Sequence, residues 1–233
     1  MKIAVFAGTP RDTQMGIDVL KESGFESLAY PFSENPEEQT KLQYYSKEEL
    51  EAIFTEKIKD AKDKSAEKIF VYCNSLSSAV DYKKISAKEN IEIITPLEGY
   101  KDIKDKKICI LAANALSAYK IDKIIKDANK DADTISIGML RLVNLIEEKR
   151  DKREIIKILD MKNFLNFLEN IGTESLILAC THFPYIKEEL ENLTNIKIID
   201  PKDYMVKEIS KKKIIKNIFI WKNSSIILNV FKN

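Results

Sequence analysis

Histidine and cysteine are scarce in this chain of 233 residues, which contains one histidine and three cysteines. Tetrahedral zinc sites combine several Cys and His ligands, commonly with a C-x-x-C pair, and the sequence has no such pair. Three cysteines in a chain of this length also do not make the dense disulfide framework of a small secreted domain. We therefore expect no metal site, and reduced thiols in a cytoplasmic protein.

Long apolar runs and glycine-rich loops are absent as well. No window approaches the roughly 18 apolar residues of a membrane helix, and the apolar start at residues 2–7 is too short for a signal peptide. The 38 basic and 37 acidic residues leave a net charge of +1, which favours neither a nucleic acid nor a membrane as partner. The six glycines form no G-x-G-x-x-G loop for a dinucleotide.

Short β-branched runs alternate with longer amphipathic stretches along most of the chain. Several runs are apolar on consecutive residues, as in strands that are buried on both faces. This alternation predicts parallel sheets with right-handed crossovers, and so an α/β fold. The predicted strands are residues 2–7, 27–30, 68–72, 91–94, 107–112, 133–137, 175–179, 196–199 and 214–220. The predicted helices are residues 14–22, 36–63, 76–86, 117–128, 139–149, 153–170 and 184–193, and the apolar segment 226–231 is expected to pack on the first domain.

Nine strands are many for one sheet in a chain of this length, which favours two domains. Pro96 and Gly99 are typical of a connection, and a fresh strand follows them. We predict a first α/β domain of residues 1–96 plus 203–233 and a second of residues 97–202, facing each other across an active-site cleft. Residues 68–75 and 175–182 support this division, because each is a strand that ends in cysteine and continues into small polar residues.

Cys73 and Cys180 are the two cysteines at these strand ends. Ligands of parallel α/β sheets bind beyond the carboxyl ends of the strands, where a following helix can lower the pKa of a thiol and make it a usable base. The alternative is that each is a small buried hydrophobic residue, as we expect for Cys109 in the apolar run 108–111. The matched positions favour function. His182 is only two residues from Cys180, whereas a catalytic base normally approaches from elsewhere in the fold.

The residues around these cysteines resemble a known family. Ala179-Cys180-Thr181-His182-Phe183-Pro184 resembles the G-C-T-H-[YF]-P signature of bacterial glutamate racemases, and Cys73-Asn74-Ser75 is similar to their C-N-T-A motif. Weaker similarities extend along the chain. Tyr30-Pro31-Phe32-Ser33 lies near the position of the family's Pro-Tyr-Gly substrate loop, and residues 108–119 resemble the opening of its second domain. Residues 142–147 resemble a family segment that ends in an acidic residue, and residues 198–200 resemble the strand that closes the second domain.

The resemblance implies a cofactor-independent amino-acid racemase, in a family that makes D-glutamate for peptidoglycan. The substrate lies between two similar domains, and inversion of its stereocentre needs an acid and a base on opposite sides of the carbon. One cysteine, as thiolate, removes the α-proton, and the other returns a proton without pyridoxal phosphate or a nicotinamide. The implied catalytic residues are Cys73, Cys180, His182 and Asp12. The implied substrate-binding residues are Gly8, Thr9, Asn74, Ser75, Thr181, Tyr30, Pro31, Phe32, Ser33, Asn114 and Glu147.

The sequence also departs from the family. Where glutamate racemases have F-D-S-G, this chain has Phe6-Ala7-Gly8-Thr9, so the acidic residue is missing. Asp12 is the nearest carboxylate in the same loop, either as a ligand of the substrate amine or as an N-cap of the following helix. Ser75 and Ala113-Asn114 also stand where the family has threonine, His182 can be structural, and Glu147 can be a solvated helix residue.

These departures leave the substrate open. Glutamate is the first choice, because His-Phe-Pro after Cys180 resembles the glutamate branch of the family. Another racemase, isomerase or decarboxylase acting on an aspartate-, hydantoin- or malonate-type acid is a second hypothesis. A third is a non-catalytic paralogue that binds small acids. The oligomeric state, a homodimer included, is open too.

Overall fold

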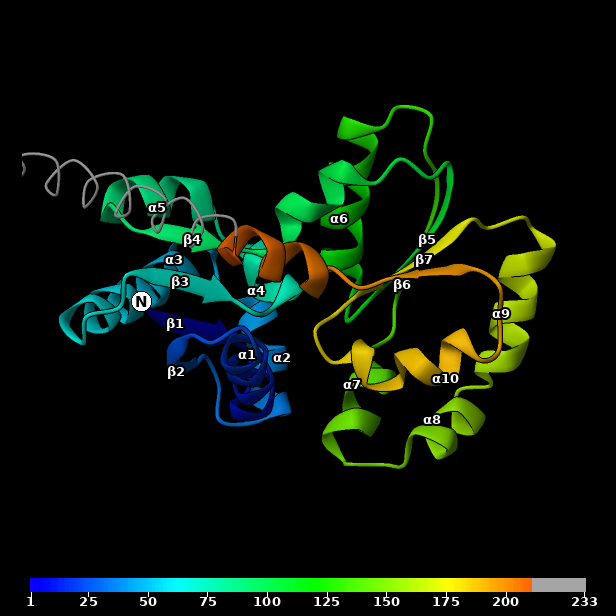
Figure 1. The fold of residues 1–233 in the computed structure, drawn as a ribbon, viewed down its shortest axis with the longest axis horizontal. Coiled ribbons are helices and arrows are strands. Elements are labelled where there is room, and N and C mark those ends of the chain that lie inside the picture. Colours follow the sequence, from blue (N-terminus) through cyan, green and yellow to red (C-terminus); the bar gives the residue numbers. More distant parts are fainter. Residues whose placement is uncertain (211–233) are drawn as a thin grey trace, which may run out of the picture.

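Two parallel four-stranded sheets organise the chain. In the computed structural model, which describes residues 1–210, the first sheet has the strand order β2-β1-β3-β4 and the second β6-β5-β7-β8 (Figure 1). All neighbouring strands are parallel, so the prediction of an α/β fold is confirmed. The strands are β1 (Lys2–Ala7), β2 (Glu26–Pro31), β3 (Lys68–Val71), β4 (Glu92–Ile94), β5 (Lys107–Ala112), β6 (Asp133–Gly138), β7 (Ser175–Ala179) and β8 (Lys197–Ile199).

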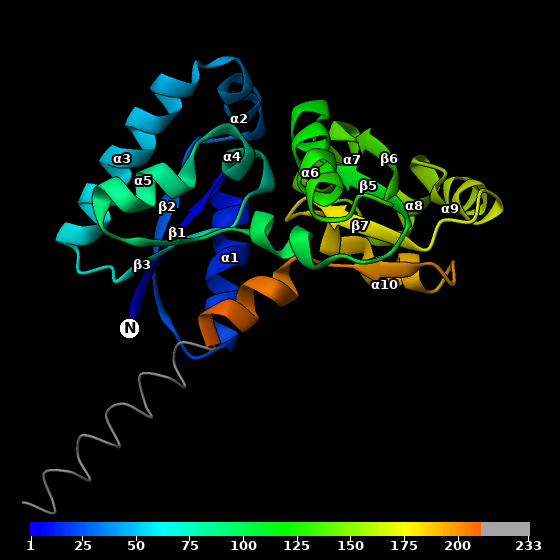
Figure 2. The ribbon, with the colours of Figure 1, turned by 90° about the horizontal axis from the view of Figure 1, so that it is seen from above.

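Helices connect the strands and cover the faces of both sheets, as Figure 2 shows from above. The α-helices are α1 (Pro10–Glu22), α2 (Pro36–Lys41), α3 (Lys47–Asp63), α4 (Asn74–Ala79), α5 (Tyr82–Glu89), α6 (Ala115–Ala128), α7 (Leu140–Glu147), α8 (Lys152–Ile158), α9 (Met161–Asn170) and α10 (Lys187–Glu191). The 3₁₀ helices are η1 (Leu42–Tyr44), η2 (Pro96–Asp102) and η3 (Phe183–Ile186).

Several helices predicted as continuous are interrupted, and polar caps explain the breaks. Ser46 and Glu49 form a capping box that starts α3 afresh after α2 and η1. Asp81 caps α5, which separates it from α4. Asp160 adopts a left-handed conformation, with φ of 48°, between α8 and α9. The predicted strand at 214–220 and the segment 226–231 lie outside the described residues.

Each sheet has an apolar cluster on both faces. In the first sheet, Ile3 and Val5 of β1 point to the side of α1, while Ala4 and Phe6 point to the side of α3 and its Phe54. The second sheet is sandwiched in the same way, with α6 on one face and helices α7 to α10 on the other. Because successive residues of a strand point to opposite faces, burial on both sides explains why these strands are apolar without alternation.

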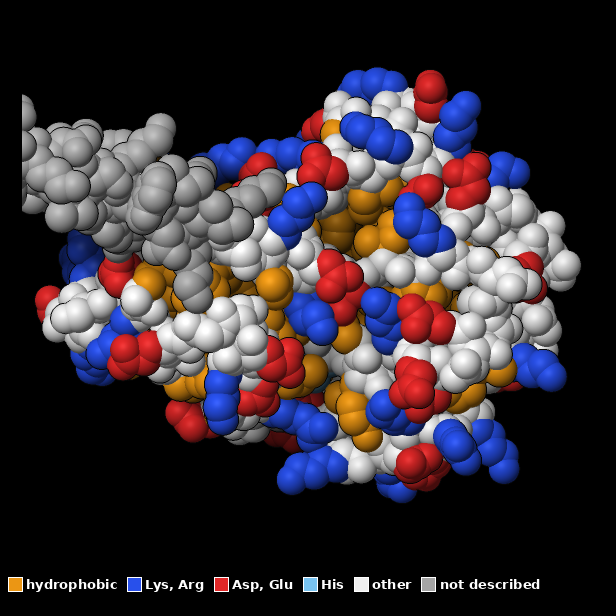
Figure 3. Space-filling model, in the orientation of Figure 1, with side chains coloured by type: hydrophobic (Ala, Val, Ile, Leu, Met, Phe, Trp, Pro, Cys, Tyr) orange, Lys and Arg blue, Asp and Glu red, His pale blue; other side chains and the backbone are white. Residues whose placement is uncertain are grey.

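The chain passes from the first sheet to the second through η2 and returns after β8. Met205 and Ile209 of this returning segment are buried against Ile3 and Val5 of the first sheet. The predicted domain boundaries at 96/97 and 202/203 stay a prediction. None of the helices within residues 1–210 is long and apolar enough to cross a bilayer. On the face in Figure 3, basic and acidic side chains are interspersed.

Candidate active site

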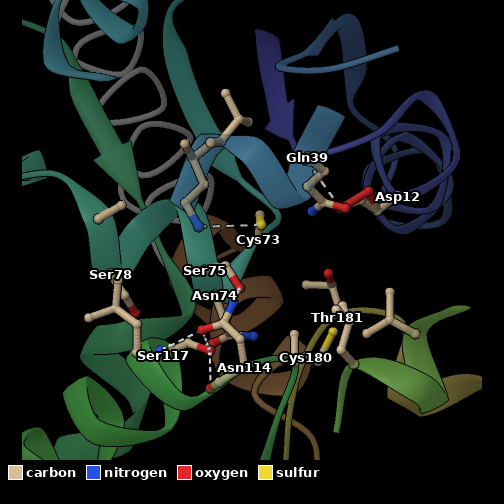
Figure 4. A pocket seen from close by; sticks show the side chains of 18 of the residues that line it. Asp12, Gln39, Cys73, Asn74, Ser75, Ser78, Asn114, Ser117, Cys180 and Thr181 are labelled. Atoms are coloured by element: carbon tan, nitrogen blue, oxygen red, sulfur yellow. Dashed lines mark hydrogen bonds between the residues drawn. The ribbon is translucent and has the colours of Figure 1, made fainter. Parts of the chain in front are cut away.

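A cavity of about 300 Å³ lies between the two domains, beyond the carboxyl ends of β1, β3, β5 and β7. This is where parallel α/β sheets place their ligands, and the volume is at the lower end of the range for small-molecule sites, roughly 300–1,000 Å³. Figure 4 shows Cys73 and Cys180 facing the same cavity, one from each domain. The predicted site residues that line it are Gly8, Asp12, Cys73, Asn74, Ser75, Asn114, Cys180, Thr181 and His182.

Cys73 follows β3 and is the N-cap of α4. Its side chain is 4% exposed, and its Sγ accepts a hydrogen bond of 3.4 Å from the backbone N–H of Leu76. Burial raises the pKa of Cys73 well above its usual range, and the negative charge of Asp12 adds to this; the backbone N–H groups of Leu76 and Ser75 act in the opposite direction. The expectation that the helix end lowers the pKa of this thiol is therefore wrong, because the cost of burying a thiolate is larger.

Cys180 follows β7 at the equivalent place in the second domain, and it has a different partner. Its Sγ lies 3.7 Å from Nδ1 of His182, and Nε2 of His182 lies 2.6 Å from Oε1 of Glu147. A spacing of two residues does allow this contact, because the chain turns tightly here and the N–H of Phe183 donates to the carbonyl of Cys180. Cys180, His182 and Glu147 thus form a hydrogen-bonded chain beside the cavity.

The pKa of His182 is held well above its usual range. Burial by itself lowers this pKa, but the hydrogen bonds with Cys180 and Glu147 and the charges of Asp12 and Cys180 outweigh it. The pKa of Glu147 is lowered: burial opposes this shift, and the hydrogen bond and charge of His182 produce it. The pair is therefore an imidazolium and a carboxylate near neutral pH, with the cation directly beside Cys180.

Glu147 also joins the two domains. Oγ1 of Thr9, in the first domain, donates to Oε1 of Glu147 at 3.1 Å, and Nη1 of Arg11 donates to the backbone carbonyl of Glu147 at 3.4 Å. Oγ1 of Thr9 also lies 3.1 Å from Oδ1 of Asp12. Because a hydroxyl has a single proton, Thr9 can donate to only one of the two carboxylates at a time.

Asp12 lies at the third position of α1, and Thr9 is the N-cap. The carboxylate of Asp12 accepts hydrogen bonds from the N–H groups of Gly8 and Thr9, which completes a capping box. It is fully buried and lines the cavity. Burial raises the pKa of Asp12, although the charge of His182 and the hydrogen bonds lower it. The prediction that Asp12 is the N-cap is therefore wrong, because α1 begins at Pro10 and Thr9 holds that position; Asp12 supports the cap from the third position of the helix and also lines the cavity.

Asn74 and Ser75 carry contacts that cross between the domains. The hydroxyl of Tyr100, in η2, donates to Oδ1 of Asn74 at 2.6 Å, which leaves Nδ2 of Asn74 buried without a partner. Nδ2 of Asn114 donates to Oγ of Ser75 at 3.2 Å. The amide of Asn74 is oriented so that its oxygen accepts the hydrogen bond of the buried Tyr100 hydroxyl. Its N–H₂ group is therefore an unpaired donor in the wall of the cavity.

The chain is similar in sequence to known glutamate racemases. No family model matches it. It is 26% identical over 171 residues to "Glutamate racemase 3" of Caldanaerobacter subterraneus subsp. tengcongensis, covering 71% of this chain and 62% of that one. It is 28% identical over 152 residues to a glutamate racemase of a Sulfurihydrogenibium species, covering 63% and 58%. The matches thus span about three fifths of the length of these relatives.

The fold of the chain is also similar to that of a solved glutamate racemase. The Francisella tularensis glutamate racemase crystallised with D-glutamate has a TM-score of 0.66 at 18% identity, covering 93% of this chain and 81% of that one. The chain is thus similar in sequence to glutamate racemases and shares the fold of this one.

The segment that resembles the glutamate racemase substrate loop does not line the cavity. The Tyr30 hydroxyl donates to Oδ2 of Asp60 at 2.6 Å, Pro31 is the last residue of β2, and the Phe32 ring packs on Phe6 and Phe54. Ser33 donates at 2.6 Å to the carbonyl of Gly8, so it supports the turn at the end of β1. Tyr30 and Phe32 thus lie against α3, and Ser33 lies against the turn at Gly8.

Other residues line the cavity that the glutamate racemase motifs did not indicate. Gln39 of α2 packs on Gly8, and a Cβ added to Gly8 would lie 1.8 Å from Nε2 of Gln39. Ser78 and Lys120 were missed as well. Helical spacing could have found the last two, because Ser78 lies four residues beyond Asn74, and Lys120 lies three residues beyond Ser117, which itself lies three beyond Asn114. Within residues 1–210, no group of three metal-ligating side chains is found.

Proposed function

We propose that this chain is a cofactor-independent amino-acid racemase that interconverts L- and D-glutamate. The observation that carries the proposal is the pair of thiols, Cys73 and Cys180, which reach one cavity from equivalent strand ends of the two domains. Inversion at the α-carbon requires an acid and a base that act from different sides. Its glutamate racemase relatives, and the D-glutamate in the Francisella tularensis structure, favour glutamate as the substrate.

The different surroundings of the two thiols suggest how one direction proceeds. Cys180, as a thiolate beside the His182 imidazolium, takes the α-proton and forms an S–H bond. The electron pair left on the α-carbon then takes the proton of the Cys73 thiol from the other side. The product is the opposite enantiomer, with Cys73 now the thiolate. The reverse direction exchanges the two roles, and proton exchange with water restores the starting state.

The polar residues around the thiols match the groups of an amino acid. The free N–H₂ of Asn74, the hydroxyl of Ser75 and Thr181 supply hydrogen bonds for the α-carboxylate. Asp12 is the only acidic side chain among the described residues that line the cavity, which makes it the partner for the substrate ammonium. Thr9 and Glu147 act indirectly, through Asp12 and His182.

The direct test is circular dichroism of pure enantiomers incubated with the purified protein. We expect the signals of L- and D-glutamate to decay to zero, and to decay at the same rate after exhaustive dialysis against a chelator and after treatment that removes pyridoxal phosphate. A panel that includes aspartate, alanine and serine checks the substrate. A requirement for added metal or for an absorbing cofactor would overturn the mechanism, and no decay for any amino acid would overturn the function.

Asp12→Asn tests the assignment of the amine ligand. Asparagine removes the charge and one of two acceptor oxygens, so this variant is expected to lose at least about tenfold in kcat/KM, since hydrogen bonds to charged groups are the strong ones. It also lowers the Tm, because the carboxylate belongs to a capping box. Glu49→Gln is the matched control, because Glu49 belongs to the capping box of α3, is exposed and does not itself line the cavity, so this change should lower the Tm alone. Unchanged turnover in folded Asp12→Asn would show that Asp12 only supports the cap of α1 and does not bind the substrate ammonium.

A further inference from the structure

The wall of the cavity between α4 and α6 carries polar groups that have no partner. Nδ2 of Asn74 and Oγ of Ser78 are both buried and unpaired, in side chains that are 2% and 9% exposed. Both residues line the cavity from α4 (Figure 4). A buried donor that lacks a hydrogen bond costs free energy, of the order of 1–3 kcal/mol. Such a pair facing a cavity therefore indicates a ligand that completes the bonds.

Helix α6 presents a cation to the same wall. Asn114, Ser117 and Lys120 follow one another at intervals of three residues and all line the cavity. The hydroxyl of Ser117 donates to Oδ1 of Asn114 at 3.0 Å. Lys120 forms no ion pair with an acidic side chain of residues 1–210 and lines the cavity. The other lysine that lines the cavity, Lys47, pairs with Glu51 at 3.6 Å. Lys120 is thus the cavity's unpaired positive charge within the described chain.

The donors on this wall favour an anion. Oδ1 of Asn74 is occupied by the Tyr100 hydroxyl, so Asn74 offers only its N–H₂ group. Asp12, the one described acidic side chain that lines the cavity, lies on α1 and not on this wall. An amide N–H₂, a hydroxyl and an ammonium group together suit carboxylate oxygens.

The spacing of the donors selects the length of the ligand. Asn74 and Ser78 are one helical turn apart on α4, a rise of about 6 Å at 1.5 Å per residue. In glutamate, four carbon–carbon bonds of about 1.52 Å separate the two carboxyl carbons, which lie roughly 5 Å apart in an extended chain. Aspartate has one bond fewer. The apolar Ala79 and Leu116 also line the cavity and offer contacts for methylene groups.

We propose that Ser78 and Lys120 bind the distal carboxylate of the substrate while Asn74 holds the α-carboxylate. The proposal rests on the proposed function and deepens it, because it assigns the choice of a five-carbon dicarboxylic amino acid to two residues of this chain. The segment at 30–33, which resembles the family's substrate loop, lies outside the cavity and is not available for this task.

Ser78→Ala and Lys120→Gln test the proposal. Each variant is expected to raise KM for glutamate at least about tenfold, the size of losing one hydrogen bond to a charged group, with little change in kcat. Each should also lower the preference for glutamate over glutamine, which has the same length without the charge. The measurement is racemisation by circular dichroism for both amino acids, together with α-proton exchange in D₂O.

Lys123→Gln is the matched control, because Lys123 is a lysine of the same helix that pairs with Asp127 outside the cavity. It should keep the wild-type KM and preference. Lys120 is exposed, so Lys120→Gln folds even where the buried Ser78→Ala loses stability. Wild-type racemisation of glutamate with unchanged KM in both variants would overturn this subsite and leave the function standing. Absence of racemisation in the wild type would overturn both.

Discussion

Cys73→Ser and Cys180→Ser are each expected to lower kcat/KM for racemisation by at least about 10²–10⁴-fold, because each removes one of the two groups that transfer the α-proton. The loss must be equal in the two directions, since enantiomers have the same free energy and the ratio of their kcat/KM values is fixed at one. Cys109→Ser is the control. Cys109 is fully buried in β5 away from the cavity, so this change lowers the Tm and leaves turnover intact.

Exchange of the α-proton in D₂O separates two bases from one. If Cys180 alone remains, it can remove the proton from one enantiomer and return deuterium to the same side. Cys73→Ser should therefore exchange one enantiomer of glutamate without inverting it, and Cys180→Ser should exchange the other. Nuclear magnetic resonance of the α-proton measures this directly. Full racemisation in either variant, or the same enantiomer exchanged by both, would rule out the assignment of opposite sides.

Burial explains why so much of the fold could be predicted. The inner strands β1, β5 and β7 have the predicted bounds, because their apolar runs stop where the sheet ends, and the inner strand β3 is one residue shorter than predicted. The helix interruptions near Ser46, Asp81 and Asp160 were missed. Each depends on a short-range cap or a left-handed residue that competes with a continuous hydrophobic pattern.

The candidate site was predictable where chemistry follows a strand. Cys73 and Cys180 lie at matched strand ends, and parallel sheets bring such ends to one edge, so their shared cavity followed from the pattern. The positions of Tyr30 and Ser33 did not follow from the pattern, because they depend on tertiary contacts, of Tyr30 with α3 and of Ser33 with the turn at Gly8. The raised pKa of Cys73 was also not predictable, since it depends on complete burial rather than on a local motif.

Glu147→Gln is expected to lower kcat/KM by about 10²-fold near neutral pH, the lower range for disabling a general acid or base. The substitution keeps the shape of the side chain and an acceptor oxygen for His182, but it removes the negative charge 2.6 Å from Nε2. Burial already disfavours the imidazolium of His182, and the bond to Glu147 is one of the contributions that offset this cost. Without the charge, the pKa of His182 falls.

The direction of the pH change follows from that shift. The His182 imidazolium is present below its pKa and is lost as the pH rises through it. Lowering this pKa therefore moves the alkaline fall of kcat/KM to lower pH in Glu147→Gln than in the wild type. Glu148→Gln is the matched control, because Glu148 is the adjacent carboxylate and pairs with Arg141 and Arg150 at the exposed surface. Its pH profile should coincide with that of the wild type.

A purely structural role for Glu147 predicts a different outcome. Glu147 also joins the domains through Thr9 and, by its backbone carbonyl, through Arg11. Glutamine keeps the backbone contact with Arg11 and can still accept a hydrogen bond from Thr9, so the contacts between the domains are largely preserved. If Glu147→Gln lowered the Tm while its pH profile and kcat/KM matched the wild type, the hydrogen-bonded chain of Cys180, His182 and Glu147 would have a structural role only. The base that opposes Cys73 would then act without help from an imidazolium.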